Sequence, residues 1–161
     1  MIINMNKKFS ISLGFTLIEL LVVIAILGVL TIIGFANFRN SQIRSRDTKR
    51  KSDLGQIQRA LEMYNNDYSS YPLSTNGLIT IGISTFDWGE ELSDVRGTVY
   101  IKELPKDPTN SSSYCYLSAD GTTYQIYAML ENTQDPRIGG PYTCGGSSTY
   151  NYGVASPNAT P

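Results

Sequence analysis

The sequence has no histidine and only two cysteines among its 161 residues. Mechanisms that use an imidazole as a base or as a metal ligand are therefore excluded, and two thiolates do not complete a tetrahedral zinc site. The length also excludes a large multidomain enzyme. We expect a non-enzymatic protein without a resident cofactor.

Each half of the chain is poor in charge of one sign. Residues 1–66 hold nine basic and four acidic residues (+5), and residues 67–161 hold four basic and ten acidic residues (−6), which sum to the net charge of −1. All 11 tyrosines lie in the stretch that begins at Tyr64, among Ser, Thr, Asn and Gly. This composition predicts an extracytoplasmic β-rich domain carried on an apolar stem.

Proline is absent before Pro72, so no proline interrupts a long helix at the start of the chain. Residues 20–38 are 19 residues without a charge. As a helix they would extend about 28 Å, which is close to the thickness of a bilayer's hydrocarbon core. A secretory signal peptide would have a shorter apolar region and a small-residue cleavage site at its end. The sequence therefore predicts one membrane crossing.

A single carboxylate, Glu19, lies at the start of this apolar run. Because an acid in a membrane segment is costly, it is functional by default and needs a partner. Residues 14–28 (GFTLIELLVVIAILG), preceded by Lys7 and Lys8, resemble the N-terminus of type IV pilins and type II secretion pseudopilins. Residues 61–72 and 100–108 also resemble the major pseudopilins.

The resemblance implies that a prepilin peptidase cleaves between Gly14 and Phe15, that Phe15 is N-methylated and that Glu19 supports filament assembly. The new amino group of Phe15 and the Glu19 carboxylate attract each other strongly in a low dielectric. Two pairings are open: between neighbouring subunits, which the resemblance favours, or within one helix, where the two residues are i and i+4.

Beyond the apolar run, Leu54, Ile57, Leu61 and Tyr64 recur at the spacing of an amphipathic helix. We therefore expect an α+β, pilin-like fold in which one helix over residues 15–66 packs on a small antiparallel sheet. The expected organisation is a leader (1–14), a membrane-spanning assembly half (15–38), an amphipathic half (39–66) and a globular domain with a loop-rich C-terminus (67–161). Asp120-Gly121 predicts the turn of a β-hairpin.

Short strands are expected over residues 78–83, 98–101, 114–117 and 124–130, and a mobile tail over residues 147–161. The exterior location that the resemblance implies favours a disulfide between Cys115 and Cys144, which would contribute about 3–4 kcal/mol. Two reduced thiols are the alternative. Calcium is a weaker hypothesis, because the candidate ligands lack a D-x-D-x-D spacing: Asp107, Asp120, Glu131 and Asp135.

A basic cluster follows the apolar run: Arg39, Arg44, Arg46, Lys49, Arg50 and Lys51. It is interpreted as a solvated helix face, or as a surface for anionic lipid or for acidic neighbours in a filament. No aromatic residue interleaves it, so we do not expect nucleic acid as a partner.

The predicted function is that of a structural subunit of a type IV pilus-like or type II secretion pseudopilus filament. The expected partners are further copies of the chain, other pilins or pseudopilins, the prepilin peptidase and the inner-membrane assembly platform. The expected location is the cytoplasmic membrane, crossed once with the globular domain outside, and the periplasm or cell surface after assembly. The alternative is a membrane-anchored adhesive or DNA-uptake module.

Overall fold

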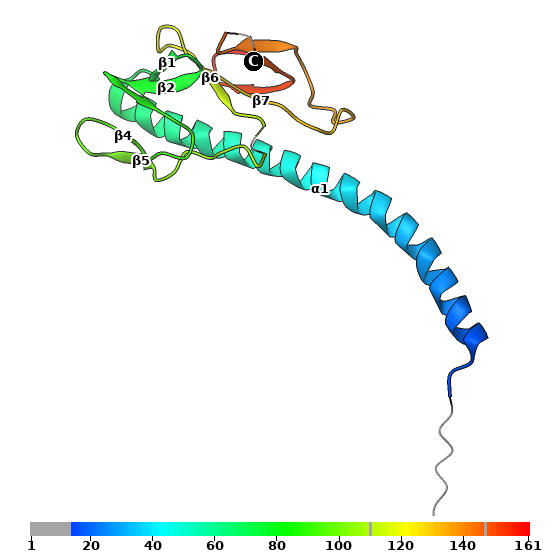
Figure 1. Cartoon of the computed structure of the whole chain (residues 1–161). Coiled ribbons are helices and arrows are strands. Elements are labelled where there is room, and N and C mark those ends of the chain that lie inside the picture. Colours follow the sequence, from blue (N-terminus) through cyan, green and yellow to red (C-terminus); the bar gives the residue numbers. More distant parts are fainter. Residues whose placement is uncertain (1–13, 110, 147) are drawn as a thin grey trace, which may run out of the picture. The chain divides into compact units, whose positions relative to one another are not determined.

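The structure is a computed structural model that describes residues 14–109, 111–146 and 148–161, with residues 33–37 and 148 described by their backbone alone. The chain divides into two compact units, Met1–Asn40 and Ser41–Pro161. Helix α1 (Leu17–Tyr68) belongs to both, and the strands that the described residues form belong to the second unit (Figure 1). The predicted α+β class is confirmed, and α1 begins and ends two residues later than expected.

In the first unit, the described side chains of α1, those of residues 17–32 and 38–40, are exposed and mostly apolar. No helical stretch among the described residues is at once long enough and apolar enough to cross a membrane. The predicted crossing, residues 20–38, includes the side chains of residues 33–37, which lie outside the described ones.

Helix α1 ends at Tyr68, two residues beyond the expected end at residue 66. Ser69 has a left-handed backbone (φ 55°), and its N–H donates to the Asn65 carbonyl at 2.7 Å. A left-handed residue just after the last helical turn is a common way to end a helix, because it satisfies a carbonyl that has no partner further along the chain. The chain then turns back, and the Tyr71 N–H donates to the Gly121 carbonyl.

Within the described residues, ten short strands form four antiparallel sheets rather than the single sheet that was expected. The two three-stranded sheets are β1-β2-β3 and β10-β7-β6. The two-stranded sheets are β4-β5 and β8-β9. In chain order the bounds are Leu73–Thr75, Leu78–Ile81, Ser84–Phe86, Leu92–Ser93, Val99–Ile101, Cys115–Leu117, Gln125–Ala128, Tyr142–Cys144, Ser148–Tyr150 and Tyr152–Ala155.

The hairpin predicted around Asp120-Gly121 is confirmed, because β6 and β7 pair with Tyr116 opposite Ile126. The single strand expected over residues 78–83 is wrong. Gly82 has a positive φ of 63°, so the chain reverses there and β2 pairs with β3. The mobile tail expected over residues 147–161 is also wrong, because β9 pairs with β8 and β10 pairs with β7.

The core of the second unit forms on the apolar stripe of α1. Leu54, Ile57 and Leu61 are fully buried, as the helical spacing predicted. They belong to one cluster with buried side chains from the strands, among them Leu92 and Ile126. Burying a Leu or Ile side chain contributes about 1.5–3 kcal/mol, so this stripe is a main source of the unit's stability.

Candidate functional site

The start of α1 is stabilised by a reciprocal pair of side chains, Thr16 and Glu19. The Thr16 hydroxyl accepts from the Glu19 N–H at 3.3 Å. In return, Glu19 Oε2 accepts from the Thr16 N–H at 2.8 Å and from its hydroxyl at 2.7 Å. This is a capping box, whose signature T-x-x-E is visible in the sequence and was not used in the prediction. Glu19 therefore has a structural role inside its own chain.

The residues around the expected cleavage position are open to solvent. The Phe15 side chain is 80% exposed. Gly14 has no positive φ, and a Cβ atom built on it would meet nothing within 4 Å. The described fold therefore gives no reason for glycine at this position. A hollow of about 360 Å³ on the same stretch is lined mainly by apolar side chains, with Glu19 among them: Phe15, Ile18, Glu19, Val22 and Val23.

In the second unit, the densest polar site is centred on Arg50, which is only 1% exposed. Its guanidinium donates to both oxygens of Asp107, at 2.8 and 2.9 Å. It also donates to Asp47 at 2.8 Å and to Glu131 at 2.7 Å. We call these four residues the Arg50 cluster. A buried charge persists only when it is paired and hydrogen-bonded, and Arg50 meets three carboxylates.

The Arg50 cluster fastens the segment after β7 to the helix. Asp47 accepts the backbone N–H groups of Glu131 and Asn132, at 3.0 and 2.8 Å. Arg46 forms two hydrogen bonds with Glu131, and Lys51 forms an ion pair with Asp135. Residues 131–135 are thus held to α1 by charged side chains of the helix.

The electrostatics of the cluster favour the charged forms. Hydrogen bonds from Arg46 and Arg50 lower the pKa of Glu131 to about 2, against the opposing effect of desolvation. For Asp107, burial raises the pKa, but the hydrogen bonds from Arg50 and Thr109 outweigh it, so the net shift is downward. Burial alone would lower the pKa of Arg50, yet its carboxylate partners raise it overall. Arg50, Asp107 and Glu131 are therefore ionised at neutral pH.

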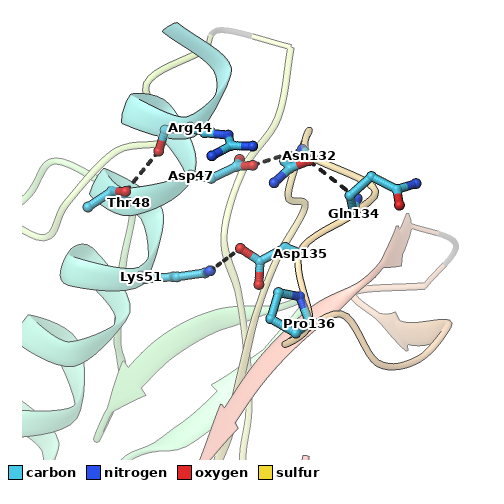
Figure 2. A pocket seen from close by; sticks show the side chains of 8 residues that line it. All are labelled: Arg44, Asp47, Thr48, Lys51, Asn132, Gln134, Asp135 and Pro136. Carbon is cyan, nitrogen blue, oxygen red and sulfur yellow. Dashed lines mark hydrogen bonds and ion pairs between the residues drawn. The ribbon is translucent and has the colours of Figure 1, made fainter. Parts of the chain in front are cut away.

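Figure 2 shows a cavity of about 330 Å³ beside this network, with Lys51 facing Asp135 and Asp47 facing Asn132. Its lining comes from α1 and from residues 132–136. Of the four charged residues that line it, Asp47, Lys51 and Asp135 have ion-pair partners in the chain, whereas Arg44 forms no ion pair among the described residues. The ion pair and hydrogen bonds around the cavity therefore connect α1 to residues 132–136.

These contacts correct two interpretations of the sequence. The interpretation of the basic cluster as a solvated face is wrong for Arg46, Arg50 and Lys51, which pair with carboxylates of their own unit. Among the calcium candidates, Asp107, Glu131 and Asp135 are bound by these cations, and Asp120 accepts hydrogen bonds from Thr122 in its turn. Within the part of the chain that the structure describes, no group of three or more His, Cys, Asp or Glu residues is placed to hold a metal ion.

The predicted disulfide between Cys115 and Cys144 is present. It links β6, in the sheet β10-β7-β6, to β8, which pairs with β9. Gly77 lies against it with φ 83°, and a Cβ atom added to Gly77 would lie only 2.5 Å from the Cys115 Sγ atom. A side chain at residue 77 would therefore displace the bridge.

Comparison with known proteins matches both regions of the chain. The family described as "Type II secretion system (T2SS), protein G" matches residues 37–141. The "Prokaryotic N-terminal methylation motif" matches residues 11–35. No solved structure matches the chain.

Several relatives are proteins named "Type II secretion system core protein G". That of Vibrio cholerae is 34% identical over 130 residues, which are 80% of this chain and 87% of the relative. That of Klebsiella pneumoniae is 37% identical over 98 residues, 61% of this chain and 69% of the relative. That of Escherichia coli K12 is 29% identical over 126 residues, 78% and 84% of the two chains. Because the family match spans more than half of its length, the chain belongs to the type II secretion system protein G family.

Proposed function

We propose that this chain is a structural subunit of a type II secretion pseudopilus. It is anchored in the inner membrane as a precursor and is then assembled into a periplasmic filament through the first half of α1. The observation that carries this proposal is that a methylation motif over residues 11–35 is followed directly by a protein G region over residues 37–141. Its partners are further copies, other pseudopilins, the prepilin peptidase and the inner-membrane assembly platform.

The peptidase cleaves between Gly14 and Phe15, and Phe15 is then N-methylated. The exposure of Phe15 and the open space around Gly14 support this assignment, because an enzyme must reach both residues. Glycine at residue 14 also has no role in the described fold. Recognition by the processing enzyme then explains why this position is glycine.

The exposed apolar surface of the first unit supports assembly through α1. Leu17, Ile18 and Ile32 are each more than two-thirds exposed. A continuous apolar surface of this kind marks a contact with lipid or with protein. In the proposed cycle, lipid covers it in the precursor and other copies cover it in the filament.

Glu19 connects subunits in this proposal while it also caps its own helix. Both hydrogen bonds from Thr16 reach Oε2, which leaves Oε1 available for a charged partner. The ammonium of a neighbouring subunit's Phe15 is that partner, and the pair is strong where water is excluded.

The test compares Glu19→Gln with Glu19→Ala in cells that carry the complete secretion system. Glutamine retains the capping box but removes the charge, whereas alanine removes both. Intact mass of the membrane-extracted chain reports cleavage and methylation, and sheared filaments report assembly. We expect both variants to be processed, and both to lose most of the filament yield. Normal filaments from Glu19→Gln would contradict the charge pair, and a chain that still carries residues 1–14 would contradict the cleavage position.

A further inference from the structure

Between residues 41 and 61, the exposed face of α1 carries charge of one sign. Both acidic residues of the helix between residues 41 and 61, Asp47 and Asp53, are buried. The exposed charged residues over the same stretch are Arg44, Lys49 and Arg59. We call these three residues the helix cations. Among the described residues, none of them forms an ion pair, in contrast to Arg46, Arg50 and Lys51.

A complementary surface lies in the connection between β3 and β4, residues 87–91, which we call the acidic loop. Asp87, Glu90 and Glu91 are exposed there. The side chain of Lys106 packs against Gly89, so the acidic loop and this lysine together carry a charge of −2. In the described part of the chain, no carboxylate of the acidic loop forms an ion pair.

The acidic loop is held in a defined conformation. The Asp87 N–H donates to Glu90 Oε2 at 2.8 Å, and the Trp88 N–H donates to Asp87 Oδ1 at 2.7 Å. Trp88 itself is buried against the Tyr114 ring. A surface that is ordered before contact loses less conformational entropy on binding than a flexible one.

We infer that the helix cations of one copy bind the acidic loop of a second copy. The two surfaces are different and lie on different elements, so each copy offers one of each. A contact between unlike surfaces is heterologous, and it extends into an open helical polymer when the rotation between copies does not close a ring. Charge complementarity of this kind sets orientation and register, and like charges placed opposite each other prevent the contact.

This inference rests on the proposed function and adds the surfaces that connect neighbouring globular units. The near-neutral total charge of the chain conceals it, because the basic residues of positions 1–66 offset the acidic residues of positions 67–161. The helix cations and the carboxylates of the acidic loop are exposed, and among the described residues none of them forms an ion pair in its own unit.

The test is charge reversal on each surface and then on both, in the full-length chain within the complete secretion system. The helix variant is Arg44→Glu with Lys49→Glu and Arg59→Glu, and the loop variant is Glu90→Lys with Glu91→Lys. We expect either variant alone to lower the yield of sheared filaments by about tenfold. The chain that carries both reversals is expected to recover to within about threefold of the wild-type yield, because opposite charges again face each other.

The matched control is Arg137→Glu, which reverses an exposed cation outside both surfaces. It is expected to leave the filament yield unchanged. Emission from Trp88 checks that the loop variant is folded, and recovery in the combined variant is itself evidence of folding.

Normal yield from both separate reversals would overturn the inference, as would a combined variant that stays as low as the separate ones. If the helix variant instead loses binding to vesicles of phosphatidylethanolamine and phosphatidylglycerol, and the loop reversal does not restore its filaments, the helix cations bind lipid and the inference is wrong. These outcomes differ from failure of the proposed function, in which the wild-type chain itself forms no filaments.

Discussion

Replacing Arg50 with methionine tests whether the Arg50 cluster stabilises the second unit. Methionine has a similar length and keeps the apolar contacts of the side-chain stem, but it leaves Asp47 and Asp107 buried without their cation. Their side chains are only 3% and 1% exposed. Removing one partner of a buried ion pair costs about 3–5 kcal/mol, because the remaining charge is not solvated.

The remaining hydrogen bonds place the expected cost at the lower end of this range. Asp47 still accepts two backbone N–H groups, and Asp107 still accepts from Thr109. We therefore expect the free energy of unfolding to fall by about 3 kcal/mol. With a urea dependence of about 2 kcal/mol per M, the midpoint of unfolding moves down by about 1.5 M.

The assay is urea unfolding of the full-length chain in detergent, followed by the emission of Trp88, its single tryptophan. Trp88 is buried edge-to-face on Tyr114, whose hydroxyl donates to Asp53 of α1 at 2.8 Å. The emission therefore reports whether the strands remain packed on the helix.

The matched control is Arg44→Met on the same helix. Arg44 is exposed and forms no ion pair among the described residues, so its replacement is expected to change stability by less than about 0.5 kcal/mol. An Arg50→Met variant that unfolds within about 0.5 kcal/mol of the wild type would refute the reasoning. It would mean that the buried carboxylates do not depend on Arg50.

Two further predictions concern the same unit. Replacing both Cys115 and Cys144 with serine is expected to lower the free energy of unfolding by about 3–4 kcal/mol in the same urea assay, and no change would show that the bridge does not constrain the unfolded chain. Acid is expected to destabilise the unit, because the pKa of Glu131 is lowered to about 2 from an ordinary value of 4.5. The contribution of Glu131 to the free energy of unfolding is complete above about pH 4.5 and is lost as the pH falls toward 2. Glu131→Gln should therefore lose less stability than the wild type between about pH 4.5 and pH 2. An equal loss of stability would contradict the stabilising role of the Glu131 carboxylate.

Local signals in the sequence were sufficient for much of the architecture. The helix follows from the apolar run, the absence of proline and the 3-and-4 spacing of Leu54, Ile57 and Leu61, because a helix depends on neighbours within one or two turns. The β6-β7 hairpin follows from Asp120-Gly121 for the same reason. The N-terminal motif is equally local, so the proposed cleavage at Gly14-Phe15 needed no tertiary information.

The strands near the C-terminus were missed because their pairing is not local. The strands over residues 148–155 are short, and their sequence (STYNYGVA) has only two aliphatic residues beside polar ones and tyrosine, so in isolation it resembles a flexible tail. They are ordered because β10 pairs with β7, which lies far earlier in the chain, and because the disulfide holds β8 beside β6.

The sequence by itself determined the long helix, the polarised charge and the processing motif, since each depends on residues that are adjacent or a few positions apart. Only the tertiary structure decided which charges are paired within the chain and which remain exposed. Arg50 and Lys49 are neighbours of the same sign, yet Arg50 is buried among carboxylates that lie 57 and 81 positions away, at Asp107 and Glu131, whereas Lys49 faces solvent. Adjacent residues on a helix point about 100° apart, so the packing of the strands against one face assigned the two cations to different roles.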